Sequence, residues 1–127
     1  MSNPLIYEKT EAFQRNFQRL FRKFRTLEQD FELAKKATLE IYHLQKINTN
    51  AIFPVPGCGS QDPQIYKLKK FACRSLKGRG SQSGIRVIYA FYPRDGRVVF
   101  LEIYFKADQE LEDRQRIADY LKEIKKS

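Results

Sequence analysis

A dense group of positive side chains lies in the middle of the chain. The interval from Lys67 to Arg86 holds seven lysines and arginines and no aspartate or glutamate. They are Lys67, Lys69, Lys70, Arg74, Lys77, Arg79 and Arg86. Lysine and arginine at this density bind phosphate oxygens by charge-assisted hydrogen bonds and release condensed counterions. The pattern therefore predicts a polyanion-binding surface, for a nucleic acid or an anionic membrane.

The overall charge is concentrated in the same region. The 127 residues carry a net charge of +9, and residues 51–106 hold 10 Lys and Arg against 3 Asp and Glu. No stretch approaches the ~18 apolar residues of a membrane span, and the first residues lack the basic-then-apolar order of a signal peptide. We therefore expect one cytoplasmic domain over residues 1–127, without membrane association.

Three predicted strands position the cations. Residues Ile85–Tyr92 and Arg97–Phe105 are rich in valine, isoleucine, tyrosine and phenylalanine, and Pro93–Gly96 between them has the residues of a hairpin turn. Residues Ile65–Ala72 alternate less regularly and form the first of the three strands, so that Arg97–Phe105 is the third. The residues from Lys46 to Gln64 hold prolines, glycines and asparagines, which indicates a loop.

Alternation along these strands separates an apolar face from a cationic face, because successive side chains point in opposite directions. The expected apolar face carries Ile85, Val87, Tyr89, Phe91, Val99, Leu101, Ile103 and Phe105. The expected opposite face carries Lys67, Lys69, Arg86, Glu102, Tyr104 and Lys106. An ion pair of Arg86 with Glu102 across the hairpin is the structural alternative to a functional role for Arg86.

The glycine-containing segment Ala72–Gly84 has two interpretations. It is a flexible connection between strands, or its glycines let backbone N–H groups approach a phosphate while Arg74, Lys77 and Arg79 supply charge. It is not a P-loop, because Gly-Lys-Ser/Thr is missing and no helix follows.

Helices are predicted on both sides of the strands. Helical spacing of apolar residues indicates one helix from Thr10 to Phe24, whose outer face is basic, and a second from a cap at Thr26 to about Leu44. A last helix over Asp108–Lys125 has acids in its first turns and lysines in its last. Met1–Tyr7 is an edge strand or a tail. The sequence thus predicts an α+β fold: a small antiparallel sheet of three to four strands, two N-terminal helices on one face and a C-terminal helix.

The cysteine and histidine content argues against a metal site and against a disulfide bond. Cys58 and Cys73 are the only cysteines and His43 the only histidine, too few soft ligands for a structural zinc site. The cysteines can pair in principle, but reduced thiols are the commoner state in a chain without a secretion signal. We expect neither metal nor cofactor.

The central stretch resembles the RelE/ParE superfamily of toxin–antitoxin toxins, in particular its HigB-like members. The resemblance lies in Ser83–Tyr89, the hairpin that follows, and Ile103–Lys106 leading to Asp108. It implies a metal-independent endoribonuclease that cuts messenger RNA on the ribosome, by attack of the ribose 2′-OH on the adjacent phosphate, and a cognate antitoxin partner. The catalytic residues that it implies are Lys67, Lys69 and Arg86. Lys106 and Tyr104 lie on the same predicted face and complete the predicted catalytic set. The remaining cations of the cluster are predicted to bind RNA: Lys70, Arg74, Lys77 and Arg79.

The sequence departs from this family's pattern near the third strand. Many members have an arginine just after it and a tyrosine or histidine in the final segment, whereas Ala107 follows Lys106 here and no histidine lies beyond His43. The general acid is therefore unassigned, with Tyr104 as a substitute. Two alternatives stay open: a ParE-like toxin that poisons DNA gyrase or binds nucleic acid without cleaving it, and a basic binding module.

Overall fold

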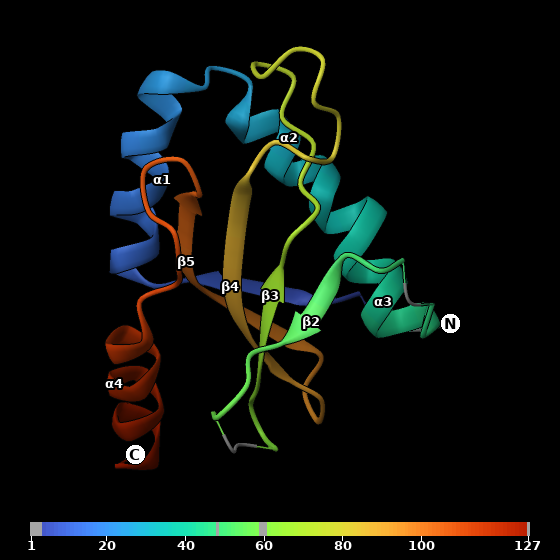
Figure 1. The fold of residues 1–127 in the computed structure, drawn as a ribbon. Coiled ribbons are helices and arrows are strands. Elements are labelled where there is room, and N and C mark those ends of the chain that lie inside the picture. Colours follow the sequence, from blue (N-terminus) through green and yellow to red (C-terminus); the bar gives the residue numbers. More distant parts are fainter. Residues whose placement is uncertain (1–3, 48, 59–60, 127) are drawn as a thin grey trace.

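The protein has an α+β fold in which helices cover both faces of a central sheet (Figure 1). The computed structural model describes residues 4–47, 49–58 and 61–126. The strands are β1 (Ile6–Lys9), β2 (Ile52–Pro54), β3 (Gln64–Leu68), β4 (Ile85–Tyr92) and β5 (Arg97–Phe105). The helices are α1 (Glu11–Lys23), α2 (Leu27–Ala34), the π-helical turn η1 (Lys35–Leu39), α3 (Glu40–Gln45) and α4 (Arg114–Lys125). The fold class predicted from the sequence is confirmed.

The sheet is larger than predicted and mixed in direction. Its order is β1-β5-β4-β3-β2, and β1 runs parallel to β5 while the other pairs are antiparallel. The N-terminal segment is thus an edge strand and not a tail. At the other edge, β2 lies inside the stretch predicted to be loop, because three residues ending in Pro54 are too few for a strand pattern. The predicted strand Ile65–Ala72 ends at Leu68.

The helix boundaries follow local capping. The start of α1 is as predicted, since the Thr10 hydroxyl accepts a hydrogen bond from the backbone N–H of Phe13 at 3.2 Å. Thr26 makes no such cap, because its hydroxyl donates to the Asp30 carboxylate at 2.6 Å. The final helix begins at Arg114 and not at Asp108, and the side chain of Asp113 caps it.

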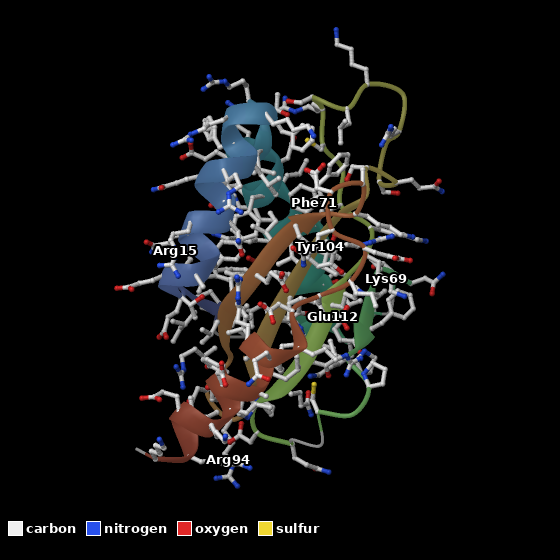
Figure 2. The ribbon with its side chains drawn as sticks, turned by 60° about the vertical axis from the view of Figure 1, so that its left-hand side comes forward. Arg15, Lys69, Phe71, Arg94, Tyr104 and Glu112 are labelled. Carbon is white, nitrogen blue, oxygen red and sulfur yellow. The ribbon has the colours of Figure 1, made fainter. Side chains whose placement is uncertain are left out.

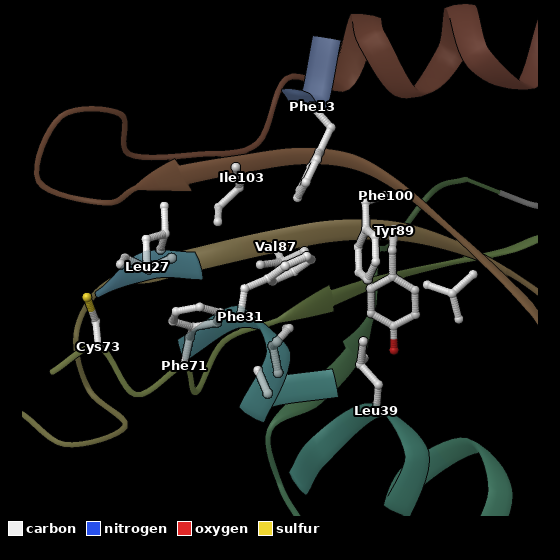
Figure 3. Packing of buried hydrophobic residues seen from close by; sticks show 14 of the residues in the cluster. Phe13, Leu27, Phe31, Leu39, Phe71, Cys73, Val87, Tyr89, Phe100 and Ile103 are labelled. Carbon is white, nitrogen blue, oxygen red and sulfur yellow. The ribbon is translucent and has the colours of Figure 1, made fainter. Parts of the chain in front are cut away.

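A core rich in aromatic residues joins α1, α2 and η1 to one sheet face (Figure 3). The Phe100 ring of β5 lies 5.3 Å from that of Phe13 and 4.8 Å from that of Phe31, measured between centroids. Leu39 and Tyr89 are buried in the same cluster. These contacts confirm that the two N-terminal helical segments pack on one face of the sheet.

One extra residue in β5 changes the predicted faces. Ile88 pairs with Glu102 while the next residue, Tyr89, pairs with Phe100, so Leu101 forms a β-bulge. Val99 and Leu101 therefore lie with Ile88 and Tyr104 against Ile117 of α4, not with Ile103 and Phe105. The expected apolar face was wrong at Val99 and Leu101, because strict alternation fails across a bulge. As a result α4 covers the hairpin half of the second face.

A buried histidine packs against the aromatic core. His43 is 5% exposed, and its Nε2 atom lies 2.7 Å from the Tyr89 hydroxyl. Its ring stacks on Phe91 with centroids 3.9 Å apart. Burial, with a smaller contribution from Lys46, lowers the pKa of His43 to about 4. The side chain is therefore neutral in the folded protein at pH 7.

We predict that His43 makes the fold sensitive to acid. The pKa of an unfolded histidine is about 6.5, so the unfolded chain takes up a proton that the folded protein refuses. The contribution of neutral His43 to the free energy of unfolding is therefore fully present above pH ~6.5. It falls by about 3 kcal/mol as the pH drops to ~4. Urea denaturation at several pH values measures this. His43→Gln should lose less stability over that window than the wild type, whereas Tyr89→Phe, which keeps the histidine, should retain the slope. Parallel losses in wild type and His43→Gln would contradict the prediction.

Candidate nucleic-acid interface

A groove of about 470 Å³ lies at the end of the sheet that α4 leaves uncovered. Four cations line it: Lys69, Lys70, Arg86 and Lys106. Phe53 and Gly84 lie in the same wall, and none of the described residues that line the groove is acidic. The groove therefore gathers cations from the end of β3, the start of β4 and the residue after β5. Three residues predicted to be catalytic, Lys69, Arg86 and Lys106, meet there.

Gly84 joins two sides of the groove. Its φ of +87° lies in the left-handed region, and a Cβ atom there would stand 3.4 Å from the Phe105 ring. Its carbonyl oxygen accepts a hydrogen bond from the backbone N–H of Lys106 at 2.8 Å. The neighbouring Ser83 is buried, and its hydroxyl accepts from the N–H of Ile85 at 3.1 Å. These contacts fix where β4 begins and hold Lys106 beside it.

The guanidinium of Arg86 is held by a backbone carbonyl group and has no acidic partner among the described residues. Its Nη1 donates to the carbonyl oxygen of Lys69. Within the described part of the chain, no carboxylate lies within ion-pair distance of its guanidinium. Glu102 faces Ile88 and accepts hydrogen bonds from Gln109 and the backbone of Asp113. The alternative pairing of Arg86 with Glu102 is therefore wrong, and the remaining guanidinium donors can meet an anion.

Lys67 stands apart from the groove in an ion pair that the sequence did not reveal. Its Nζ donates to the Glu112 carboxylate at 2.6 Å, and the two side chains are 15% and 5% exposed. Burial lowers the pKa of Lys67, but its interactions with Glu112 and Tyr104 together more than offset this, so the pKa is raised. Neighbouring cations therefore do not depress the pKa of Lys67, because Glu112 pairs with it. Lys67 is a charged ammonium, not a base.

Tyr104 is a neighbour of both Arg86 and Lys67. It faces Arg86 across the β4–β5 ladder, and the Lys67 ammonium is 5.9 Å from the centroid of its ring. Burial raises the pKa of Tyr104, against the effect of Lys67, so the hydroxyl keeps its proton at neutral pH. Figure 2 shows Tyr104 and Glu112 at the middle of the molecule, Lys69 near its edge and Arg94 far from all three.

The cations of the glycine segment differ in their surroundings. Lys70, Lys77 and Arg79 are exposed, and Arg79 reaches the carbonyl of Ser83 at 3.5 Å. Arg74 instead forms an ion pair with the buried Asp30, 3.0 Å between Nε and Oδ1. Its backbone N–H donates to the same carboxylate at 3.0 Å. Arg74 thus ties the segment to α2, while the other three keep their charge exposed.

Three residues of this region were not predicted from the sequence: Asp30, Phe53 and Glu112. The Lys69 ammonium lies 4.8 Å above the Phe53 ring, a cation–π contact. Phe53 was assigned to a loop and Glu112 to a helix turn. An excess of acids just before α4 was the one visible sign that a carboxylate could meet the cationic face.

Other features bear on cofactors and membranes. In residues 4–47, 49–58 and 61–126, no three His, Cys, Asp or Glu side chains are grouped to hold a metal ion. Cys58 and Cys73 are free thiols. No helix in these ranges is both long and apolar enough to cross a bilayer.

Comparison with known proteins gives two structural neighbours. No protein-family model matches the chain, and no curated protein matches its sequence. A chain of the archaeal RelE–RelB complex from Pyrococcus horikoshii OT3 aligns with a TM-score of 0.49 at 12% identity, covering 82% of this chain and 97% of that one. A mutant of the E. coli toxin RelE in the free state aligns with a TM-score of 0.47 at 18% identity, covering 85% and 90%. At these identities the likeness is one of backbone course.

We predict that Asp30 stabilises the fold and the cationic segment together. Asp30→Ala removes an acceptor of the Thr26 hydroxyl and of two Arg74 donors, and bonds to a charged group are worth ~1.5–3 kcal/mol. Urea denaturation should show a loss of about 2–3 kcal/mol. Amide hydrogen exchange in residues 72–84 should accelerate. Glu28→Ala, an exposed acid on the same helix, should stay within about 0.5 kcal/mol of wild type. Equal effects of the two substitutions would refute the anchoring role.

Proposed function

We propose that this protein is the toxin of a toxin–antitoxin pair, a metal-independent endoribonuclease that cleaves messenger RNA on the ribosome. The observation that carries the proposal is the acid-free groove of Lys69, Lys70, Arg86 and Lys106, which adjoins the buried Tyr104 hydroxyl. Such a groove suits a phosphodiester, because its cations can offset charge that grows on the phosphorus oxygens. The resemblance of Ser83–Tyr89 to RelE/ParE toxins agrees with this chemistry.

The reaction is a transfer of phosphorus from one oxygen to another. The ribose 2′-oxygen bonds to phosphorus and loses its proton to a base, and the bond from phosphorus to the 5′-oxygen breaks. The products are a 2′,3′-cyclic phosphate and a 5′-hydroxyl, so the step consumes no water. The leaving oxygen needs a proton from a general acid.

Residues in the groove and beside it can supply the positive charge and the proton. Arg86 has guanidinium donors left for two phosphate oxygens, and Lys69 and Lys106 add positive charge. Tyr104 is the candidate general acid, because burial raises its pKa and it faces Arg86 in the next strand. Lys67 contributes charge only, since Glu112 holds it in the ammonium form.

A second candidate function is a toxin that binds nucleic acid or poisons DNA gyrase without cleaving RNA. The pairing of Lys67 with Glu112 favours it, because that contact removes the lysine as a base. A short reading frame for an antitoxin beside the gene would fit both toxin functions, and would argue against a basic binding module.

We predict that expression of the chain alone arrests growth with cleavage of messenger RNA, and that Arg86→Ala abolishes cleavage. Loss of one contact made in the transition state costs ~10²–10³ in rate. Arg94→Ala is the matched control, since its side chain is 86% exposed at the hairpin turn, far from the groove. Cleavage of ribosome-bound message and the thermal midpoint are measured for all three proteins.

Two results would change this assignment. A stable Arg86→Ala variant with undiminished cleavage removes Arg86 from the site. A wild type that cleaves no RNA, with or without ribosomes, transfers the assignment to the non-nuclease toxin.

We also predict that binding of an uncleavable 2′-deoxy oligonucleotide weakens steeply with salt, because each cation contact releases counterions. Arg79→Ala should reduce the slope of log affinity against log salt by about 1. Arg74→Ala should change the slope less, since Asp30 offsets its charge. Equal slopes for wild type and Arg79→Ala would show that the glycine segment does not touch the ligand.

A further inference from the structure

The Tyr104 hydroxyl is an exception to the rule that buried polar groups find partners. Tyr104 is 4% exposed, and across the described residues its hydroxyl is the one buried side-chain oxygen or nitrogen without a hydrogen bond. A buried hydroxyl without a partner typically costs ~1–3 kcal/mol. Such a group gains most from a ligand that supplies the missing bond. In the free protein this hydroxyl is therefore available to donate a hydrogen bond to a ligand.

An ion pair lies near the same side chain, since the Lys67 ammonium is 5.9 Å from the centroid of the Tyr104 ring. Lys67 has Glu112 as its acidic partner, at 2.6 Å, and no other ion pair of Lys67 occurs in the part of the chain described. Glu112 has a second cation, because its Oε2 lies 3.4 Å from Nη2 of Arg114. If the carboxylate leaves Lys67, it keeps Arg114, whereas Lys67 is left with a free ammonium.

The Glu112 carboxylate can leave Lys67 by rotation of its own side chain. Glu102 is 2% exposed and accepts from Gln109 Nε2 at 2.7 Å and from the backbone N–H of Asp113 at 2.8 Å. These bonds fasten the chain on both sides of Glu112 to the sheet. Rotation of the Glu112 side chain from Lys67 toward Arg114 leaves the anchors intact. The segment itself can stay in place.

We propose that Lys67 and Tyr104 form a phosphate subsite, which the Glu112 carboxylate occupies in the free protein and an RNA phosphate takes over on binding. The carboxylate stands in for the phosphate on the ammonium, and the arriving phosphate oxygen accepts the hydrogen bond that the Tyr104 hydroxyl lacks. The subsite adjoins the groove because Tyr104 faces Arg86. This inference rests on the proposed function, in that RNA is the ligand. Glu112 is then an internal competitor that weakens RNA binding.

The test uses binding without cleavage. A 2′-deoxy oligonucleotide lacks the attacking hydroxyl, so its affinity reports the subsite even if the protein proves to be no nuclease. Glu112→Gln should bind it about tenfold more tightly than wild type, as expected when one charged competitor is removed. Glu110→Gln is the matched control, since it removes one charge from an exposed side chain of the same segment. It should change affinity less than about twofold.

Two further measurements separate the subsite from a general charge effect. The increase in oligonucleotide affinity caused by Glu112→Gln should vanish in a Lys67→Met background and become smaller in a Tyr104→Phe background. In the wild type, the side-chain carboxyl ¹³C resonance of Glu112 should shift when the oligonucleotide is added, while that of Glu110 stays. This last readout needs no variant to fold.

Several outcomes overturn the inference. They are equal gains for Glu112→Gln and Glu110→Gln, a gain that persists without Lys67, weaker binding by a folded Glu112→Gln, and an unmoved Glu112 resonance at saturation. The last two would mean that Glu112 fixes Lys67 in place and is not exchanged. If the wild type does not cleave messenger RNA but the binding results are as expected, the proposed nuclease activity is refuted and the phosphate subsite is supported.

Discussion

The pairing of β4 with β5, including the extra residue at Leu101, governs the rest of the structure. It sends Tyr89 and Phe100 into the aromatic core with α1 and α2. It turns Val99 and Leu101 to the other face, where they pack with α4. Beyond the bulge the ladder sets Arg86 opposite Tyr104. A change of register by one residue would reverse these faces and separate the cationic groove from the buried hydroxyl.

Much of the fold is visible in the sequence where the signal is local. The hairpin of β4 and β5, the cap at Thr10 and the helical stripe of α1 depend on neighbouring residues, so periodicity and turn chemistry predict them. The bulge at Leu101 and the edge strand β2 depend on partners distant in the chain. The acids before α4 were assigned to its first turn because dipole arguments do not distinguish a cap from the residues preceding it.

The candidate site divides in the same way. Alternation along strands placed Lys67, Lys69, Arg86 and Tyr104 on one face, which the strand register supports. It could not show that Lys67 meets Glu112, 45 positions later, or that Arg74 meets Asp30, 44 positions earlier. Such contacts decide which cations are free to bind a ligand. Composition counts every cation alike, whereas burial and pairing distinguish them.

The parallel pairing of β1 with β5 has a consequence for synthesis of the protein. Ile6 has Arg97 as its register partner, so the first strand waits for most of the chain before its edge of the sheet can close. Lys106 and Glu112 follow later still. Contacts so distant in sequence form late, because a long loop must close before they contribute. The groove that holds Lys69, Arg86 and Lys106 therefore cannot be complete until nearly the whole chain has been synthesised. The order of strands delays assembly of the binding surface to the end of translation.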